Sequence, residues 1–93
     1  MRAKPVVNRR LVMSDASFIE MVAWKVPTPL RGSRHDYKYR FAYVVEGACI
    51  LRYDNEAGKG DHRHIGAQEL PYTFTSFDRL VKDFLDDVER LKT

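Results

Sequence analysis

The last part of the chain carries apolar residues at helical spacing, from about Ser76 to Leu91. Thr75 precedes this segment and Asp78 follows three residues later, a hydroxyl and an acid that are typical of a helix start. The pattern therefore predicts one amphipathic C-terminal helix. We interpret its apolar stripe as the face that packs on the core, rather than as a surface for a partner. The stripe consists of Phe77, Leu80, Val81, Phe84, Leu85, Val88 and Leu91.

Upstream of this helix, apolar and polar residues alternate with the period of a β-strand. The clearest case is Tyr37–Val45, in which Lys38 and Arg40 separate aromatic residues. Pro27 and Pro29 end an earlier strand and begin a long loop. The alternation predicts strands at Lys4–Met13, Phe18–Val26, Tyr37–Val45, Ala48–Asp54 and Asp61–Ile65, and a last extended piece at Glu69–Phe74.

Glu46 and Gly47 mark the hairpin between the third and fourth of these strands. With a three-residue loop at 45–47, Tyr43 faces Cys49, and apolar residues share one side of the sheet. A two-residue turn would set a cation opposite Phe41, so we expect the longer loop. The expected register also pairs Phe41 with Leu51, Tyr39 with Tyr53, Arg40 with Arg52 and Lys38 with Asp54.

The next hairpin brings the most polar segment of the chain into the sheet. A five-residue loop at Glu56–Gly60 pairs Asn55 with Asp61 and leaves Arg63 on the core side, which is unfavourable for a cation unless its strand lies at an edge. In this register His62 faces Asp54, and His64 faces Arg52. Six polar residues on three adjacent strands then share the other side of the sheet: Lys38, Arg40, Arg52, Asp54, His62 and His64.

These elements predict an α+β fold, an antiparallel meander of about five strands with one C-terminal amphipathic helix packed on its apolar face. At 93 residues the chain suits a single domain, 1–93, with one small core. The other side of the sheet is expected to be basic and exposed to solvent. Cys49 lies in an apolar run, so we expect a buried thiol there.

The formal net charge is +3, and the basic excess lies outside the predicted helix, because residues 76–93 contain five acids and four bases. A basic body suits a polyanion such as RNA, or an acidic protein. No segment has the ~20 apolar residues of a membrane span, and no signal peptide opens the chain. We therefore expect a cytoplasmic protein without membrane contact.

Groups that transfer protons and bind anions concentrate between Arg52 and His64. His62 and His64 are two residues apart, so they project from the same side of a strand with Cβ atoms about 7 Å apart. Two imidazoles at this spacing suit a general base and a general acid on either side of one phosphate. Asp54 is expected to orient one imidazole, and Arg52 to bind the phosphate. We therefore predict that His62, His64, Asp54 and Arg52 are catalytic in RNA cleavage.

Five further residues are expected to contact RNA phosphates: Lys38, Arg40, Lys59, Arg63 and His35. Lys59 lies between two glycines but outside any Walker motif, so an exposed hairpin tip is the competing interpretation. His35 is isolated in the long loop, where an ordinary surface residue is the simpler interpretation. Two histidines and a carboxylate are also metal ligands, but the neighbouring cations repel a dication. We therefore expect neither a metal nor another cofactor.

The string RYDNEAGKGDHRH at residues 52–64 resembles the signature of the TumE-type toxin family of bacterial toxin–antitoxin systems. The strings SRHDYKYR at 33–40 and SFIEMVAWKVP at 17–27, and the ending from Tyr72 to Arg90, are similar to the same family. The resemblance implies a small cytoplasmic toxin and a cognate antitoxin, often with a helix-turn-helix DNA-binding region, that neutralises it by binding. It implies no set of catalytic residues.

Two functions are compatible with these patterns. The first is a metal-independent endoribonuclease that cleaves cellular RNA by histidine acid–base chemistry. The second is a non-catalytic basic protein that inhibits a nucleic-acid-linked target by binding alone, until its antitoxin neutralises it. RNA cleavage that persists in excess EDTA but is lost in His62→Ala and His64→Ala supports the first function. Toxicity without RNA cleavage supports the second, or an enzyme with another substrate. Both are compatible with a monomer or a homo-oligomer.

Overall fold

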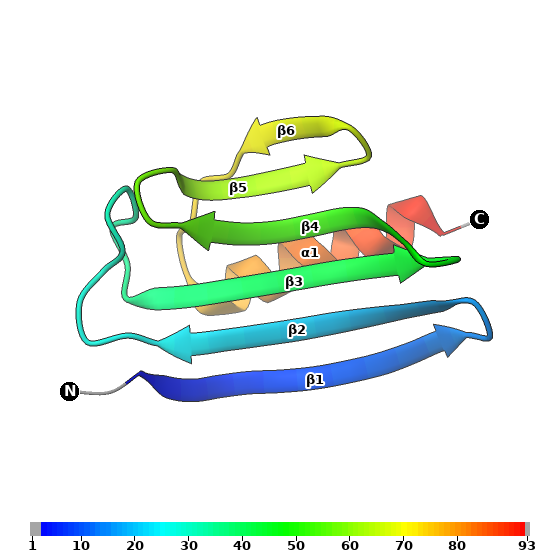
Figure 1. The fold of residues 1–93 in the computed structure, drawn as a ribbon, viewed down its shortest axis with the longest axis horizontal. Helices are drawn as coiled ribbons and strands as arrows, with labels where there is room; N and C mark the ends of the chain where they lie inside the picture. The colour runs from blue at the N-terminus through cyan, green and yellow to red at the C-terminus, as the bar shows by residue number, and fades with distance from the viewer. Residues whose placement is uncertain (1–2, 93) are drawn as a thin grey trace.

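The computed structural model describes residues 3–92, which form one antiparallel sheet and one helix (Figure 1). Each strand pairs with the next one along the chain, so the spatial order is β1 to β6. The predicted α+β meander is confirmed, with six strands because the last extended piece pairs with its predecessor. The elements are β1 (Lys4–Ser14), β2 (Ser17–Lys25), β3 (Tyr37–Val45), β4 (Ala48–Glu56), β5 (Gly60–Ile65), β6 (Gln68–Pro71) and α1 (Phe77–Leu91).

The hairpin between β3 and β4 differs from the predicted one. Val45 pairs with Ala48 across a two-residue turn, in which Glu46 and Gly47 both have positive φ. Such turns match the twist of a hairpin. A β-bulge then shifts the register before Tyr43, so this residue faces Leu51. The predicted register was wrong by two residues, but a shift of two keeps every side chain on its predicted side. The corrected partners are Tyr53 for Phe41 and Asp54 for Arg40.

The hairpin between β4 and β5 has the predicted register. Asn55 pairs with Asp61, and Asp54 pairs with His62. Arg52 pairs with His64. This agreement fixes which polar residues of the two strands are direct neighbours.

Helix α1 packs behind the middle of the sheet (Figure 1). Its buried residues Leu80, Phe84 and Val88 join the aromatic and aliphatic side chains of β2, β3 and β4 in one core. The stripe is therefore a core face, as predicted, although Leu85 at its border is 40% exposed. Among residues 3–92, no helix is long and apolar enough to cross a membrane.

Two local predictions at the ends of these elements were wrong. Ser76, not Thr75, caps the helix, because its backbone is extended and its hydroxyl accepts a bond from the Arg79 N–H at 3.1 Å. Cys49 is exposed rather than buried. It lies beside the bulge at the start of β4, where the register changes.

Arg63 points to the helix side of the sheet, as its position in the strand requires. A carboxylate of α1 compensates its charge: Arg63 lies 3.2 Å from Asp87, whose side chain is 4% exposed. The hydroxyl of Tyr53 donates a hydrogen bond to the same carboxylate. Burial raises the pKa of Tyr53, so this hydroxyl keeps its proton and remains a donor. The condition under which the sequence tolerated Arg63 on this side, an edge position for its strand, is not met, because β6 pairs on the outer side of β5.

Candidate functional site

The face of the sheet opposite α1, called the open face below, carries a compact group of charged side chains; Figure 1 looks onto this face. Arg52 and Asp54 of β4 lie directly opposite His64 and His62 of β5. Glu69 of β6 faces His64 from the other side. Because residues two apart on a strand share a side, all five side chains lie on the open face. We call these five residues the histidine cluster.

Arg52 lies at the centre of the histidine cluster. One of its guanidinium nitrogens is 3.2 Å from Nε2 of His64, and its Nε is 3.1 Å from Asp54. A guanidinium only donates hydrogen bonds, so Nε2 of His64 accepts this one. The other ring nitrogen of His64, Nδ1, lies 3.9 Å from Glu69. The 3.8 Å between His64 and Asp54 is too long for a hydrogen bond.

His62 has different neighbours. Its Nε2 lies 3.5 Å from Glu69, and the carboxylate is an acceptor only, so a proton on this nitrogen is favoured by the contact. The rings of His62 and His64 lie side by side, with centroids 6.4 Å apart. Their side chains are 17% and 25% exposed, so a ligand on the open face can reach both.

Lys38 and Arg40 extend the charged surface onto β3. Arg40 lies opposite Asp54 and 3.7 Å from Glu20 of β2. Lys38 lies opposite Trp24 of β2. The structure thus brings all six polar residues that were predicted to share a side onto the open face.

The remaining predicted site residues lie elsewhere. Lys59 is at the tip of the hairpin between β4 and β5, where it is exposed and 3.9 Å from Glu56. Arg63 is on the helix side of the sheet, bound to Asp87. His35 belongs to a separate cavity at one end of the sheet. These three residues therefore do not contact the histidine cluster.

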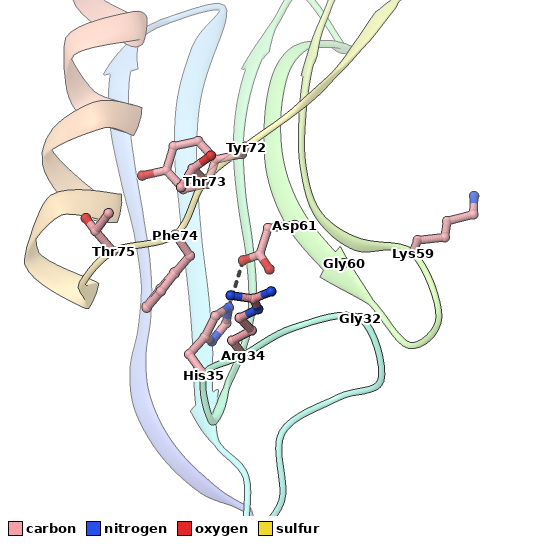
Figure 2. A pocket seen from close by; sticks show the side chains of 10 residues that line it. All are labelled: Gly32, Arg34, His35, Lys59, Gly60, Asp61, Tyr72, Thr73, Phe74 and Thr75. Carbon is pink, nitrogen blue, oxygen red and sulfur yellow. Dashed lines mark hydrogen bonds and ion pairs between the residues drawn. The ribbon is translucent and has the colours of Figure 1, made fainter.

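We call this cavity, which contains His35, the loop pocket (Figure 2). Nε2 of His35 is 2.8 Å from Asp61, and Nδ1 accepts a bond from the Tyr37 N–H at 3.2 Å. The imidazole is therefore neutral, with its proton shared toward the carboxylate. Its ring stacks on Phe74 at 3.7 Å between centroids. The pocket is lined by Gly32, Arg34, His35, Lys59, Gly60, Asp61, Tyr72, Thr73, Phe74 and Thr75.

The loop from 26 to 36 reaches this position through close backbone contacts. A Cβ atom on Gly60 would lie 2.8 Å from the carbonyl oxygen of Gly32, and Gly60 has a positive φ. The Gly58 N–H donates a bond to the Arg31 carbonyl at 2.6 Å. The glycines between β4 and β5 therefore allow the loop to lie against the hairpin.

A family model described as Toxin TumE matches residues 3–92, nearly the whole chain. The chain belongs to the TumE toxin family. It is therefore a toxin of a toxin–antitoxin system, with a cognate antitoxin as its partner. No curated protein and no solved structure matches the chain.

Sequence reasoning missed two parts of the sites in this TumE-family toxin. Glu69 was placed in an extended piece without a register, so its position beside both histidines was not found. Asp61 was placed in the β4–β5 hairpin, but its partner His35 lies 26 residues earlier in a loop without periodicity. Within the described chain, no group of three His, Cys, Asp or Glu side chains is placed to hold a metal ion.

Proposed function

We propose that this TumE-family toxin is a metal-independent endoribonuclease that acts on cellular RNA in the cytoplasm. The observation that carries this proposal is the pair formed by His62 and His64, side by side on the open face with an arginine bonded to one of them. RNA supplies its own nucleophile, the 2′-hydroxyl. The protein then needs a base, an acid and a cation around one phosphate, and the histidine cluster contains all three.

The contacts of the two histidines support a division of roles. We propose His64 as the base: once Arg52 turns from Nε2 to the phosphate, this nitrogen is free to take the proton from the 2′-hydroxyl. His62, beside Glu69, is proposed as the acid that gives a proton to the leaving 5′-oxygen. The 2′-oxygen forms a bond to phosphorus as the bond to the 5′-oxygen breaks. The products are a 2′,3′-cyclic phosphate and a 5′-hydroxyl, with no net change in protons.

Arg52 is proposed to bind the phosphate and its developing charge. Its side chain is 33% exposed, and Asp54 lies 3.1 Å from its Nε as an ion-pair partner. A phosphate oxygen is an acceptor that matches the planar guanidinium fork. Asp54 then holds the guanidinium in position from β4.

The surface beside the histidine cluster fits a single RNA strand. Lys38 and Arg40 are exposed next to it, and Trp24, opposite Lys38, is 38% exposed. Exposed aromatic rings between cations are typical of surfaces on which unpaired bases stack. We propose that the RNA crosses the open face from β2 to β5.

The second candidate function, inhibition by binding alone, is favoured by one observation. The open face carries exposed apolar side chains at both ends of the β1–β2 hairpin, Val12 (76% exposed) opposite Phe18 and Trp24 (38%) opposite Pro5. Such a surface suits a protein partner. We propose that the cognate antitoxin, a protein with a DNA-binding region, neutralises the toxin by covering the open face.

Purified toxin with RNA in excess EDTA tests the proposal. We expect cleavage that ends in a 2′,3′-cyclic phosphate and fails on 2′-O-methyl RNA. His62→Ala and His64→Ala should each lower the rate about 10²- to 10⁴-fold. Gln68→Ala is the matched control, because Gln68 is an exposed residue of β6, and it should leave the cleavage rate unchanged. Growth arrest without any RNA cleavage, retained in both histidine variants, would instead support inhibition by binding.

A further inference from the structure

The loop pocket is separate from the histidine cluster, although the two sites meet at adjacent residues. Asp61 points to the helix side of the sheet, and His62 points to the open face. The cavity has a volume of about 540 Å³, within the usual range of small-molecule sites. It lies between the loop before β3, the β4–β5 hairpin and the segment that leads into α1 (Figure 2).

The floor of the pocket is a network whose polar groups bond to one another. Asp61 accepts hydrogen bonds from Ser33 at 2.8 Å, His35 at 2.8 Å and Tyr39 at 2.6 Å. Burial, followed by the bond to Asp61, raises the pKa of Tyr39 well above its ordinary value, so its hydroxyl stays a donor. Three donors disperse the charge of this carboxylate, which is 7% exposed. The floor is therefore a rigid support rather than a ligand-binding surface.

The groups at the mouth of the pocket remain available. Arg34 is exposed and forms no ion pair within residues 3–92; Figure 2 shows it extending toward the His35–Asp61 pair. The hydroxyls of Thr73 and Thr75 have no hydrogen-bond partner in the same part of the chain. Lys59 lines the rim but points away from the cavity in Figure 2. The hydrogen bonds of Asp61 hold the loop before β3 in place. Arg34 and the two threonines take no part in these bonds.

We propose that the loop pocket binds the phosphate monoester of a nucleotide, either free or at the end of an RNA strand. A guanidinium fork matches the oxygens of a phosphate, and the hydroxyls of Thr73 and Thr75 line the same cavity. Tyr72 and Phe74 add an aromatic wall beside them. The fixed floor holds Arg34 near the site before the ligand arrives, which lowers the entropy cost of binding. This inference does not depend on RNA cleavage at the histidine cluster.

Calorimetric titration of the full chain tests the proposal with uncleavable probes. The probes are uridine, uridine 5′-monophosphate, and a 2′-O-methyl uridine trinucleotide with and without a 5′-phosphate. We expect each phosphorylated probe to bind at least about tenfold more tightly than its unphosphorylated form. Arg34→Ala should weaken this binding about 10- to 100-fold, the usual effect of losing a charged hydrogen bond. Arg34→Lys should recover part of it, because the charge remains but the fork is lost.

Arg9→Ala is the matched control, because it removes one exposed cation from β1, at the other edge of the sheet. It should bind like wild type. A trinucleotide that binds more tightly than the mononucleotide identifies an RNA end as the ligand, and equal affinities identify a free nucleotide. Equal binding of uridine and its monophosphate, or wild-type affinity in Arg34→Ala, would overturn the proposal. The double variant His62→Ala, His64→Ala should still bind the phosphorylated probes. Binding at the loop pocket is therefore tested separately from RNA cleavage at the histidine cluster.

Discussion

The guanidinium of Arg52 lies 3.2 Å from Nε2 of His64, and this contact determines which imidazole nitrogen is free of a proton. An arginine cannot accept a hydrogen bond, so Nε2 of His64 is the acceptor in this contact. His62 has no such cation beside it and instead lies near Glu69. Two histidines on one strand thereby have different neighbours, a cation beside His64 and a carboxylate beside His62.

The first prediction concerns the pH dependence of RNA cleavage. Imidazoles change charge between about pH 5 and 8, and one histidine must be neutral while the other is charged, so the rate should follow a bell. Protonation of His64 should cause the acidic limb, and deprotonation of His62 the basic limb. A pH–rate series should therefore lose the acidic limb in His64→Ala and the basic limb in His62→Ala. Arg52→Ala should lower the rate but keep both limbs. An unchanged bell in either histidine variant would contradict the assignment.

The second prediction concerns the carboxylate beneath the sheet. Asp87→Ala removes the partner of both Arg63 and the Tyr53 hydroxyl. We expect it to lower the free energy of unfolding by about 3 kcal/mol, because a largely buried cation loses its ion-pair partner and the Tyr53 hydroxyl keeps only its longer bond to the Asp83 carbonyl. Urea denaturation measures the loss. Asp86→Ala, on the exposed side of the same helix turn, should change it by less than about 0.5 kcal/mol. If Asp87→Ala and Asp86→Ala lowered the free energy of unfolding equally, the contacts of Asp87 with Arg63 and Tyr53 would not stabilise the fold.

The third prediction tests the core face of α1. Phe84→Asp or Leu80→Asp places a charge among side chains that are 0% exposed, which costs several kcal/mol against a total stability of about 5 to 15 kcal/mol. We expect both proteins to be unfolded by circular dichroism at 25 °C. Leu85→Asp, at a residue 40% exposed, should stay folded. A folded Phe84→Asp protein with wild-type melting temperature would contradict the packing of α1.

The fourth prediction concerns the alkaline limit of stability. Burial, followed by a bond to Asp83, raises the pKa of Tyr72, whose hydroxyl lies 2.7 Å from that carboxylate. An unfolded tyrosine loses its proton near pH ~10, whereas the folded one keeps it. Stability should therefore be complete below about pH 10 and fall above it. In urea denaturation at pH 8 and 10.5, Tyr72→Phe should show a smaller decrease than wild type. The same decrease in both proteins would contradict a role for Tyr72.

The fifth prediction concerns the antitoxin. We expect its contact surface to be acidic where it meets Lys38 and Arg40, so that salt weakens the complex. Trp24 is the one tryptophan of the chain, and its fluorescence should change when a tryptophan-free antitoxin segment covers the open face. Lys38→Glu should weaken the complex, whereas Lys4→Glu on the edge strand β1 should not. A complex that leaves the open face accessible to RNA would contradict neutralisation by occlusion.

The parts of the fold that depend on alternation were predictable from the sequence. The partners of His62 and His64 followed from glycine at the hairpin and from the need to keep apolar residues together. The partners of Arg40 did not follow, because a short turn and a bulge replaced the longer loop that was expected. The predicted and the observed pairing of β3 with β4 differ by two residues, so both place each side chain on the same side of the sheet. Residue type alone therefore does not distinguish them.

The loop pocket shows a different limit of sequence reasoning. His35 and Asp61 meet because two glycine-containing loops lie against each other, and neither loop has a period that fixes its path. Arg63 shows the converse case. Its side was predicted correctly, but the carboxylate that accepts it comes from a helix that packs across the sheet. Contacts between distant segments follow from packing, which a local pattern does not describe.

The order of the strands has a consequence for synthesis of the toxin. Since every strand pairs with its predecessor in the chain, the sheet is able to assemble from local hairpins as the polypeptide lengthens, and such topologies fold rapidly. The core lacks Leu80, Phe84 and Val88 until the final helix has been made. A nascent chain that ends before Phe77 therefore has strands without the layer that holds them together. Translation of α1 therefore decides when the folded domain first becomes stable.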